Sequence, residues 1–279
     1  ARAGRRGGGQ PRCRLHATVA PAQVPAGEML LGDPVELGGN DRIGFVQQVA
    51  LGTGVCVVAG GKCVVLSSDG SKFMDVDVDD VRQLMCKRAE APVVSVQVMT
   101  LNRPRFLQHA LQLISRQDVP RSTFEVIVVD DSPTCTLAFD TLRGLDEGFV
   151  RECVRFIHLE QRMSIGAKRN MAAAVSRGSV VMHWDDDDYF GPARIRLQSA
   201  PILSGQADMT LIPLVWTFNV RDAWGSEGFY KADTGAGGDM CTMCYRRSLW
   251  SEHDTLRRYP DASLMEDLFL YRNLVGVDG

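Results

Sequence analysis

The feature that most constrains the fold of this chain is an alternation of strand-like and helix-like segments that begins at residue 93. Nearly continuous apolar runs of strand length occur at 93–100, 124–132, 154–160 and 180–184. Between them, 104–117 and 166–178 carry apolar residues at helical intervals, and we expect Gly178 to close the second helix. Buried strands that alternate with helices are typical of a mostly parallel sheet covered on both faces. The predicted fold class is therefore α/β.

Polar residues gather immediately after three of these strands. Thr100, Asn102 and Arg103 follow the first strand, and Asp130 and Asp131 follow the second. The four aspartates Asp185–Asp188, here called the aspartate tetrad, follow the fourth. The carboxyl ends of parallel strands meet at one edge of a sheet, which is where ligands bind in such folds. Each group also has a local reading, as a turn or as the start of a helix. Their coincidence at one edge favours a binding site.

The aspartate tetrad needs a specific explanation, because adjacent carboxylates repel one another. If the chain stays extended, Asp185 and Asp187 point to one side and Asp186 and Asp188 to the other. A pair of carboxylates at that spacing suits a hard divalent cation such as Mg²⁺ or Mn²⁺, which also takes oxygen ligands from substrate phosphates. The tetrad therefore predicts a metal and diphosphate site, with Asp188 alternatively serving the turn into the next helix.

The first 88 residues have a different pattern. Residues 1–25 contain five arginines, no acid and no apolar periodicity, which predicts a disordered tail, with an organelle-targeting segment as the alternative. Residues 26–88 contain five short β-type runs separated by Gly-Gly and Asp-Gly turns, which predict a small antiparallel barrel. The barrel resembles SH3-like and Tudor-like barrels in architecture only. Such a module usually binds a partner or packs on its neighbour.

Composition excludes several classes of protein. A net charge of −3 argues against a nucleic-acid binder with a basic surface, and no apolar run reaches the roughly 18–20 residues of a membrane span. Eight cysteines at irregular spacings indicate reduced thiols, and we expect a cytoplasmic location. Cys241 and Cys244 lack the second pair that a structural zinc site needs, so they are predicted to lie in the core.

Four segments together resemble the successive motifs of family 2 glycosyltransferases, which have the GT-A fold and invert the anomeric carbon. They read "VSVQVMTLNRPRFLQHALQLI", "EVIVVDDSP", "SIGAKRNMAAAVSRGSVVMHWDDDDYF" and "MEDLFLYRNL". The resemblance covers 93–279 and does not extend to the predicted barrel at 26–88. It implies a nucleotide-diphospho-sugar transferase domain. The family usually continues well beyond the last motif, so we expect this domain to be truncated at its carboxy terminus.

The resemblance also assigns roles to individual residues. Those expected to contact the donor nucleotide or sugar are Thr100, Asn102, Asp130, Asp131, Arg169, Asp185 and Asp186. Asp187 is the expected direct metal ligand, with Asp185 as its partner. Asp267 is the expected general base, supported by Glu266, because an acceptor hydroxyl becomes a good nucleophile when a carboxylate removes its proton.

An acceptor site is expected between the tetrad and the base. The glycine-rich segment 219–240 contains Trp224 and ends beside Asp239, and Arg246 follows in the next strand-like run. Glycine-rich loops can close over a substrate, and aromatic faces suit sugar rings, although core packing is an equally simple role for one aromatic residue. We predict that Trp224, Asp239 and Arg246 lie near the acceptor.

The predicted function is transfer of a sugar, with inversion and with Mn²⁺ or Mg²⁺, from a UDP- or GDP-sugar to a hydroxyl of a saccharide, lipid or protein. The alternative is a catalytically weak or inactive nucleotide-sugar-binding protein that is recruited through the barrel. A nucleotidyltransferase should carry a glycine-rich basic loop after the first strand, and "TLNRPRF" lacks it.

Overall fold

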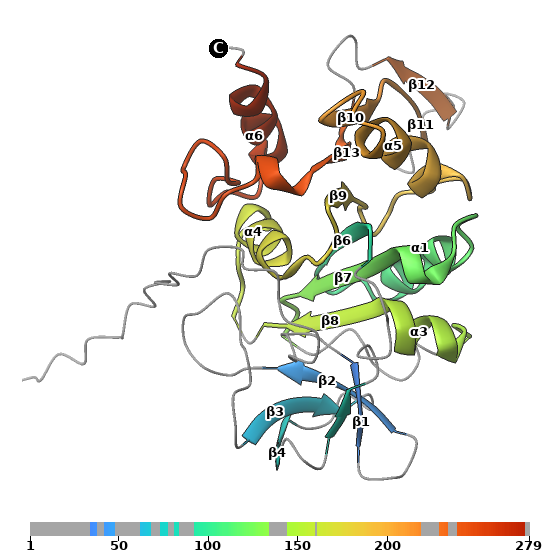
Figure 1. The fold of residues 1–279 in the computed structure, drawn as a ribbon, viewed down its shortest axis with the longest axis vertical. Coiled ribbons are helices and arrows are strands. Elements are labelled where there is room, and N and C mark those ends of the chain that lie inside the picture. Colours follow the sequence, from blue (N-terminus) through green and yellow to red (C-terminus); the bar gives the residue numbers. More distant parts are fainter. Residues whose placement is uncertain are drawn as a thin grey trace, which may run out of the picture.

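The computed structural model describes residues 92–133, 144–159, 161–213 and 239–276, together with the backbone of seven further strands. Its centre is a six-stranded sheet in the order β10-β13-β9-β6-β7-β8 (Figure 1). The strands are β6 (Val94–Thr100), β7 (Phe124–Asp130), β8 (Val154–His158), β9 (Val180–His183), β10 (Met209–Ile212) and β13 (Asp239–Arg246). Four neighbours, β9, β6, β7 and β8, run parallel, while β13 is antiparallel to both β9 and β10. The predicted α/β class is confirmed.

Helices cover both faces of this sheet. They are α1 (Pro104–Ser115), α3 (Glu147–Cys153), α4 (Ile165–Val175), α5 (Arg194–Leu203) and α6 (Glu266–Val275). Residues of α1, α3 and α5 belong to the core on one face, and residues of α4 and α6 belong to the cores on the other. Apolar side chains on both faces of the parallel strands therefore have partners, as their continuous apolar sequence requires.

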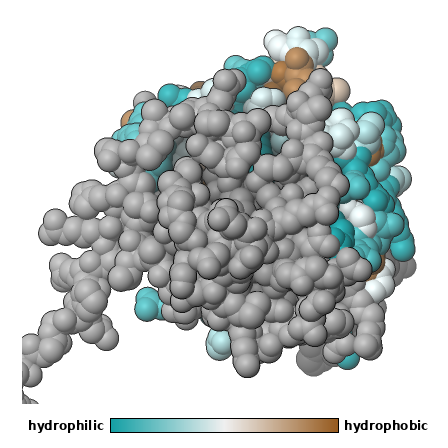
Figure 2. Space-filling model, turned by 60° about the horizontal axis from the view of Figure 1, so that its bottom comes forward, coloured by the Kyte–Doolittle hydropathy of each residue, from teal (hydrophilic) through white to brown (hydrophobic). Residues whose placement is uncertain are grey.

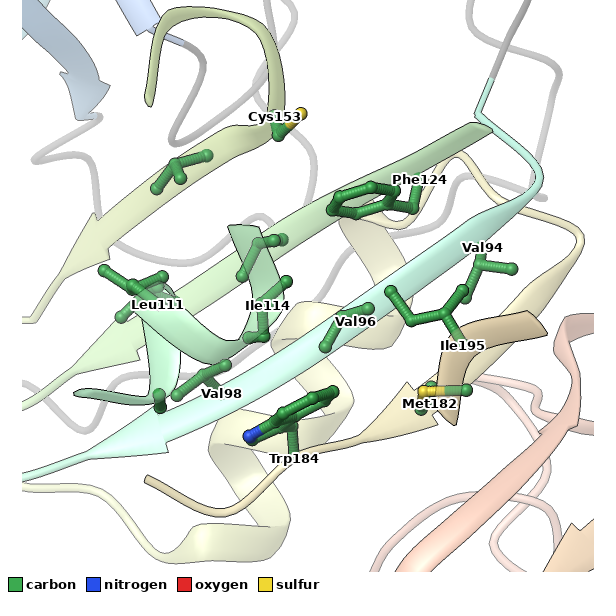
Figure 3. Close-up of a cluster of buried hydrophobic side chains, with 14 of the residues drawn as sticks. Val94, Val96, Val98, Leu111, Ile114, Phe124, Cys153, Met182, Trp184 and Ile195 are labelled. Carbon is green, nitrogen blue, oxygen red and sulfur yellow. The ribbon is translucent and has the colours of Figure 1, made fainter. Parts of the chain in front are cut away.

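The strand alternation of β6 shows how the two cores arise. Val96 and Val98 point toward α1 and pack with Leu111 and Ile114 (Figure 3). Their neighbour Met99 faces the other way, into the core beneath α4. All seven residues of β6 are buried, so the strand is enclosed by helices on both sides.

The structure corrects two local expectations. The helix α4 ends at Val175, three positions before Gly178, so Gly178 does not close it. A Cβ at Gly178 would lie 2.7 Å from Ser95 N, so this glycine is required by the close approach of the chain to β6. The start of α5 is also not capped by Asp188, because its N-cap residue is Ala193 and no side chain bonds there.

The amino-terminal region forms a separate antiparallel sheet in the order β4-β3-β2-β1-β5. Its strands are β1 (Pro34–Leu37), β2 (Arg42–Gln47), β3 (Lys62–Ser67), β4 (Phe73–Asp77) and β5 (Val81–Gln83). One of the five β-type runs, "GVCVVAGG" at 54–61, and the expected tail at 1–25 lie outside the described residues. The barrel, its resemblance to SH3-like modules and the domain boundaries therefore stay predictions.

A small hairpin of β11 (Leu214–Phe218) and β12 (Phe229–Asp233) stands apart from the central sheet. Figure 2 shows one face of the molecule, on which the coloured part of the surface is mainly hydrophilic and the most visible apolar area lies near the top. Among the helices that the structure describes, none is long and apolar enough to cross a membrane.

Candidate active site

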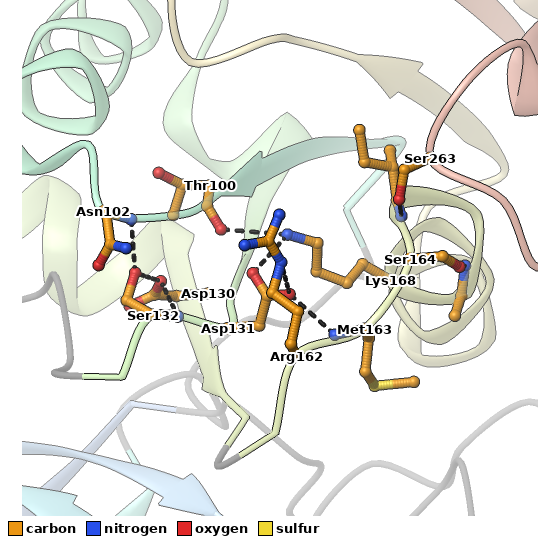
Figure 4. Close-up of polar contacts among 12 residues, drawn as sticks. Thr100, Asn102, Asp130, Asp131, Ser132, Arg162, Met163, Ser164, Lys168 and Ser263 are labelled. Atoms are coloured by element: carbon orange, nitrogen blue, oxygen red, sulfur yellow. Dashed lines mark hydrogen bonds and ion pairs between the residues drawn. The ribbon is translucent and has the colours of Figure 1, made fainter.

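The ends of β6 and β7 are tied together by a chain of short polar contacts (Figure 4). Asp130, the last residue of β7, accepts hydrogen bonds at Oδ1 from the backbone N–H of Ser132 at 3.0 Å and from its hydroxyl. The Ser132 oxygen in turn accepts from Asn102 N at 2.7 Å. Asn102 has a φ of 54°, a left-handed conformation that turns the chain directly after β6. Both strand ends are thus fixed at one edge of the sheet.

The next residue, Asp131, connects the end of β7 to the segment that contains α4. Its two oxygens accept from Lys168 Nζ at 2.8 Å and from Met163 N at 2.9 Å. Lys168 Nζ also donates to Thr100 O at 3.1 Å, so one ammonium joins α4 to the ends of both strands. Arg162, whose side chain is 71% exposed, lies 3.7 Å from Asp131 and gives this edge an accessible cation.

The aspartate tetrad forms a turn, which overturns the expectation of an extended segment. β9 ends at His183, and Asp188 N donates to Asp185 O at 3.2 Å. The two-residue period therefore does not set the directions of these side chains. Asp186 and Asp187 instead share the guanidinium of Arg103, with Nη1 at 3.0 and 2.8 Å from their respective oxygens.

Asp186 is the buried member of the tetrad. Its Oδ2 accepts from the Thr100 hydroxyl at 2.7 Å, and its side chain is 4% exposed. Burial raises the pKa of Asp186, although the hydrogen bonds from Thr100 and Arg103 favour the ionised form. Asp187, by contrast, is 47% exposed and is available to a ligand.

Asp185 connects the tetrad to the helix that carries the expected base. Arg169 on α4 donates from Nη2 to Asp185 Oδ1 at 3.2 Å and from Nε to Glu266 Oε1 at 3.2 Å. Glu266 and Asp267 form the buried first turn of α6. Burial lowers the pKa of Arg169, but the nearby carboxylates, Asp185 foremost, outweigh it and leave the pKa raised. Arg169 therefore remains a buried cation.

Asp239 and Asp267 reach the same region. The thiol of Cys241, at the start of β13, has its pKa raised first by burial and then by the charges of Asp185, Asp239 and Asp267. These three carboxylates come from the tetrad, β13 and α6, and all lie close enough to act on one thiol. Burial, followed by the charges of Asp185 and Asp187, also raises the pKa of Asp188 to about 7. The site is strongly acidic.

One predicted acceptor residue, Arg246, is not part of this cluster. Arg246 pairs with Asp208 at 2.9 Å and donates to Ile202 O at 2.7 Å. It lies opposite Val180, where β9 begins, and thus at the far end of the strand from the tetrad. The predicted acceptor role of Arg246 does not fit this placement. Trp224 lies outside the described residues.

The structure also brings into the site two residues to which the sequence had assigned no role. Lys168 and Arg103 contact the predicted carboxylates directly. Both stood in motifs already recognised, "GAKRN" and "TLNRP", but only the neighbouring residues were assigned. A search for cations to offset so many buried carboxylates would have found them, because buried charges are normally paired.

A metal site made by protein ligands alone is not evident. Within the described ranges, no group of three or more His, Cys, Asp or Glu side chains has the arrangement of metal ligands. Asp185 and Asp187 could supply two carboxylates, each of which now contacts an arginine. Mg²⁺ and Mn²⁺ often bind through one or two carboxylates plus substrate phosphates, so this donor set is sufficient for them.

Similar proteins were found by sequence. TarS of Staphylococcus aureus (strain Mu50), a poly(ribitol-phosphate) beta-N-acetylglucosaminyltransferase, is 30% identical over 121 residues, which are 43% of this chain and 20% of that protein. The uncharacterized glycosyltransferase MJ1057 of Methanocaldococcus jannaschii is 30% identical over 115 residues, covering 41% of this chain and 38% of the relative. The chain thus spans between a fifth and two fifths of these relatives.

The fold is also similar to solved structures. The structure of S. aureus TarS 1–349 in complex with UDP superposes with a TM-score of 0.50 and 24% identity, over 66% of this chain and 55% of that one. This likeness confirms the GT-A fold. The model of the family described as Glycosyl transferase family 2 matches residues 95–260, which is more than half of the chain. The chain therefore belongs to glycosyl transferase family 2.

Proposed function

We propose that this protein transfers a sugar from a nucleotide-diphospho-sugar to an acceptor hydroxyl, with inversion and with help from a divalent cation. The observation that carries the proposal is the convergence of three acidic groups at one edge of the sheet. These groups are the paired aspartates after β7, the aspartate tetrad after β9 and the first turn of α6. Ligands of open parallel sheets bind at this edge.

The donor nucleotide is proposed to lie against the ends of β6 and β7. Asp130 and Asp131 are almost fully buried and already hydrogen-bonded, so they act mainly by fixing the groups around them. Asn102 and Arg162 are exposed beside them and can meet the base, ribose or phosphate. Thr100 acts indirectly, because its hydroxyl donates a hydrogen bond to Asp186.

Asp187 and Asp185 are the proposed holders of Mn²⁺ or Mg²⁺. Arg103 places a positive charge beside Asp187, which supports the proposal of a cation at that carboxylate. When bound, the metal would neutralise charge on the leaving diphosphate. Arg103 is 50% exposed, so it can release Asp187 and remain near the phosphates.

Asp267 is the proposed general base, supported by Glu266. Its carboxylate lies in the first turn of α6, and its Oδ1 accepts from Leu268 N at 2.7 Å, which leaves the second oxygen for an acceptor. As Asp267 takes the acceptor proton, the acceptor oxygen bonds to the anomeric carbon and the bond from that carbon to the diphosphate breaks. This is a single displacement, which inverts the anomeric carbon. General-base catalysis typically contributes about 10²–10⁴-fold to the rate.

The donor is proposed to be a UDP- or GDP-sugar. The S. aureus relative is an N-acetylglucosaminyltransferase whose structure is known in complex with UDP, and UDP-sugars are therefore the first choice. The acceptor class, whether saccharide, lipid or protein, follows from neither comparison and must be found by screening.

The test is donor turnover by the purified chain with UDP-, GDP- and dTDP-sugars, in Mn²⁺ and in EDTA. We expect Asp267→Asn to lower kcat by about 10²-fold or more and Asp187→Ala to remove the response to Mn²⁺. Asp118→Asn, at an exposed ion pair with Arg196, is the control and should leave both unchanged. Product with retained configuration would contradict inversion, and nucleotide binding without any turnover would favour the non-catalytic binding protein.

A further inference from the structure

The amino-terminal turns of α4 lie between the two halves of the candidate site. Lys168 reaches toward the ends of β6 and β7, where it binds Asp131 and Thr100 O. The next residue, Arg169, reaches toward the tetrad and α6. This short segment, Gly166–Asn170, thus touches both the proposed donor side and the proposed base side.

Arg169 joins two carboxylates that are far apart in the sequence. Its side chain is 3% exposed, and Asp185 and Glu266 each lie 3.2 Å from one of its nitrogens. Without this cation, two buried acids of α6 would face the tetrad with no positive charge between them. Removing one partner of a buried ion pair leaves an uncompensated charge, which is strongly unfavourable.

Asn170 fixes the segment that leads into α6. Its Nδ2 donates to Tyr259 O at 2.8 Å, and its Oδ1 accepts from Tyr259 N at 3.0 Å and from Trp250 Nε1 at 2.9 Å. One amide side chain therefore satisfies both backbone groups of Tyr259. The side chain thus pairs with Tyr259 as the backbone of a neighbouring strand would. It fixes the position of the backbone at Tyr259, seven residues before Glu266.

Gly166 allows the start of α4 to come close to the backbone of residues 260–262. Its N–H donates to Ala262 O at 2.9 Å, and a Cβ at this position would lie 1.9 Å from Pro260 O. A backbone carbonyl cannot move aside as a flexible side chain can, so only glycine permits this contact. Ser263 adds a further bond, from Ile165 N to its hydroxyl at 3.2 Å.

The residue before α6 carries backbone strain. Met265 has a φ of 61°, in the left-handed region that a non-glycine residue rarely adopts. Such a conformation persists only when its surroundings hold it. The contacts of α4 with residues 259–266 supply that constraint and orient the first turn of the helix.

We propose that Gly166, Arg169 and Asn170 are positioning residues that hold the first turn of α6, and with it the carboxylate of Asp267, against the tetrad. The inference rests on the proposed function for its catalytic consequence. It replaces the expectation that Arg169 contacts the donor nucleotide, because this side chain is buried between two carboxylates and faces the protein interior.

The experiment compares Arg169→Lys and Asn170→Ala with wild type in three measurements. These are kcat and KM for donor turnover, UDP binding by calorimetry, and hydrogen exchange of peptides that cover 259–276. We expect kcat to fall tenfold or more, UDP binding to change less than threefold, and exchange in 259–276 to accelerate. Asn170→Ala changes no charge, so it keeps the test informative if Arg169→Lys folds poorly.

The matched control is Arg155→Lys, which alters a buried arginine in an ion pair with Glu125, near where β7 begins. It should lower thermal stability but leave kcat and the exchange of 259–276 as in wild type. Equal exchange of 259–276 in wild type and both test variants would overturn the inference, whether or not the protein is active. So would a loss of UDP binding with a raised KM and an unchanged kcat, because the variants would then act on the donor site. Lack of UDP binding and turnover by wild type would count against the proposed function alone.

Discussion

At the scale of single residues, Asp188 is a half-buried carboxyl group that stands close to two other aspartates of the tetrad. Burial, followed by the charges of Asp185 and Asp187, raises its pKa from 3.8 to about 7. The group is therefore neutral in the folded chain under mildly acidic conditions and ionised in the unfolded chain. Folding binds a proton in this range, so stability falls as the pH rises from about 4 to about 7.

We predict that Asp188→Asn removes much of this fall. In EDTA, variant and wild type should have similar stability near about pH 4, and the variant should be more stable near about pH 8. The difference between 3.8 and about 7 corresponds to roughly 4 kcal/mol at most, and partial solvation reduces it. Urea unfolding across this range measures it.

Asp118→Asn is the control for this prediction. The pKa of Asp118 is lowered, mainly by its hydrogen bonds from Arg196, so its ionisation favours the folded state instead. This variant should retain the fall in stability with rising pH. Parallel curves for Asp188→Asn and wild type would show that the charge of Asp188 is not opposed by its surroundings.

The same residues show what could be predicted from the sequence at this scale. The position of the tetrad at the sheet edge follows from one buried strand and the carboxylates behind it. The directions of its side chains do not, because the turn closed by Asp188 N and the partners Thr100 and Arg103 decide them. Contacts between residues some 80 positions apart leave no local signal.

At the scale of secondary-structure elements, the connection from α4 to β9 depends on Gly178. Its N–H donates to Ser95 Oγ at 2.9 Å, and a Cβ would lie 2.7 Å from Ser95 N and 2.8 Å from the carbonyl carbon of Val94. The glycine thus lets this connection pass directly over the start of β6. Glycine is common at helix ends and also where two backbone segments come close, so the sequence suggested a helix end. Only the tertiary contact with β6 distinguishes the two roles.

We predict that Gly178→Ala destabilises the fold by about 2 kcal/mol or more, since β6 is the central strand and cannot move aside. Thermal or urea unfolding would measure the loss. Gly191→Ala is the matched control, because no heavy atom lies within 4 Å of a Cβ there. A loss of equal size in both variants would mean that loss of glycine itself, and not the contact with β6, is responsible.

At the scale of the whole molecule, the two ends of the sheet have different roles, one in the candidate site and one in stability. The carboxyl ends of the strands carry the acidic site. The other end holds Glu125, fully buried on β7, which binds Ser95 Oγ at 2.6 Å, Arg177 N at 2.7 Å and Arg155 Nη1 at 3.3 Å. These partners come from β6, from β8 and from the segment after α4, so one carboxylate ties four parts of the fold together.

The alternation of strands and helices was enough to predict this architecture, because apolar runs and helical spacing are local properties. The Glu125 network was not predictable, since a charged residue inside an apolar run is ambiguous until its partners are known. This network lies at the opposite end of the strands from the tetrad. Residues that stabilise the fold are therefore separate from those proposed to act in the reaction. Changes here should affect the free energy of unfolding and not the catalytic parameters.

We therefore predict that Arg155→Met lowers stability by about 3–5 kcal/mol, because Glu125 loses a cation where both side chains are 0% exposed. The double variant Glu125→Gln with Arg155→Met should recover part of this loss, since the fully buried carboxylate is then removed together with the arginine. Urea unfolding gives both values, and donor turnover below the unfolding transition gives kcat. If kcat fell tenfold in the folded double variant, the two ends of the sheet would be coupled, and the separation of stability from chemistry in this fold would be wrong.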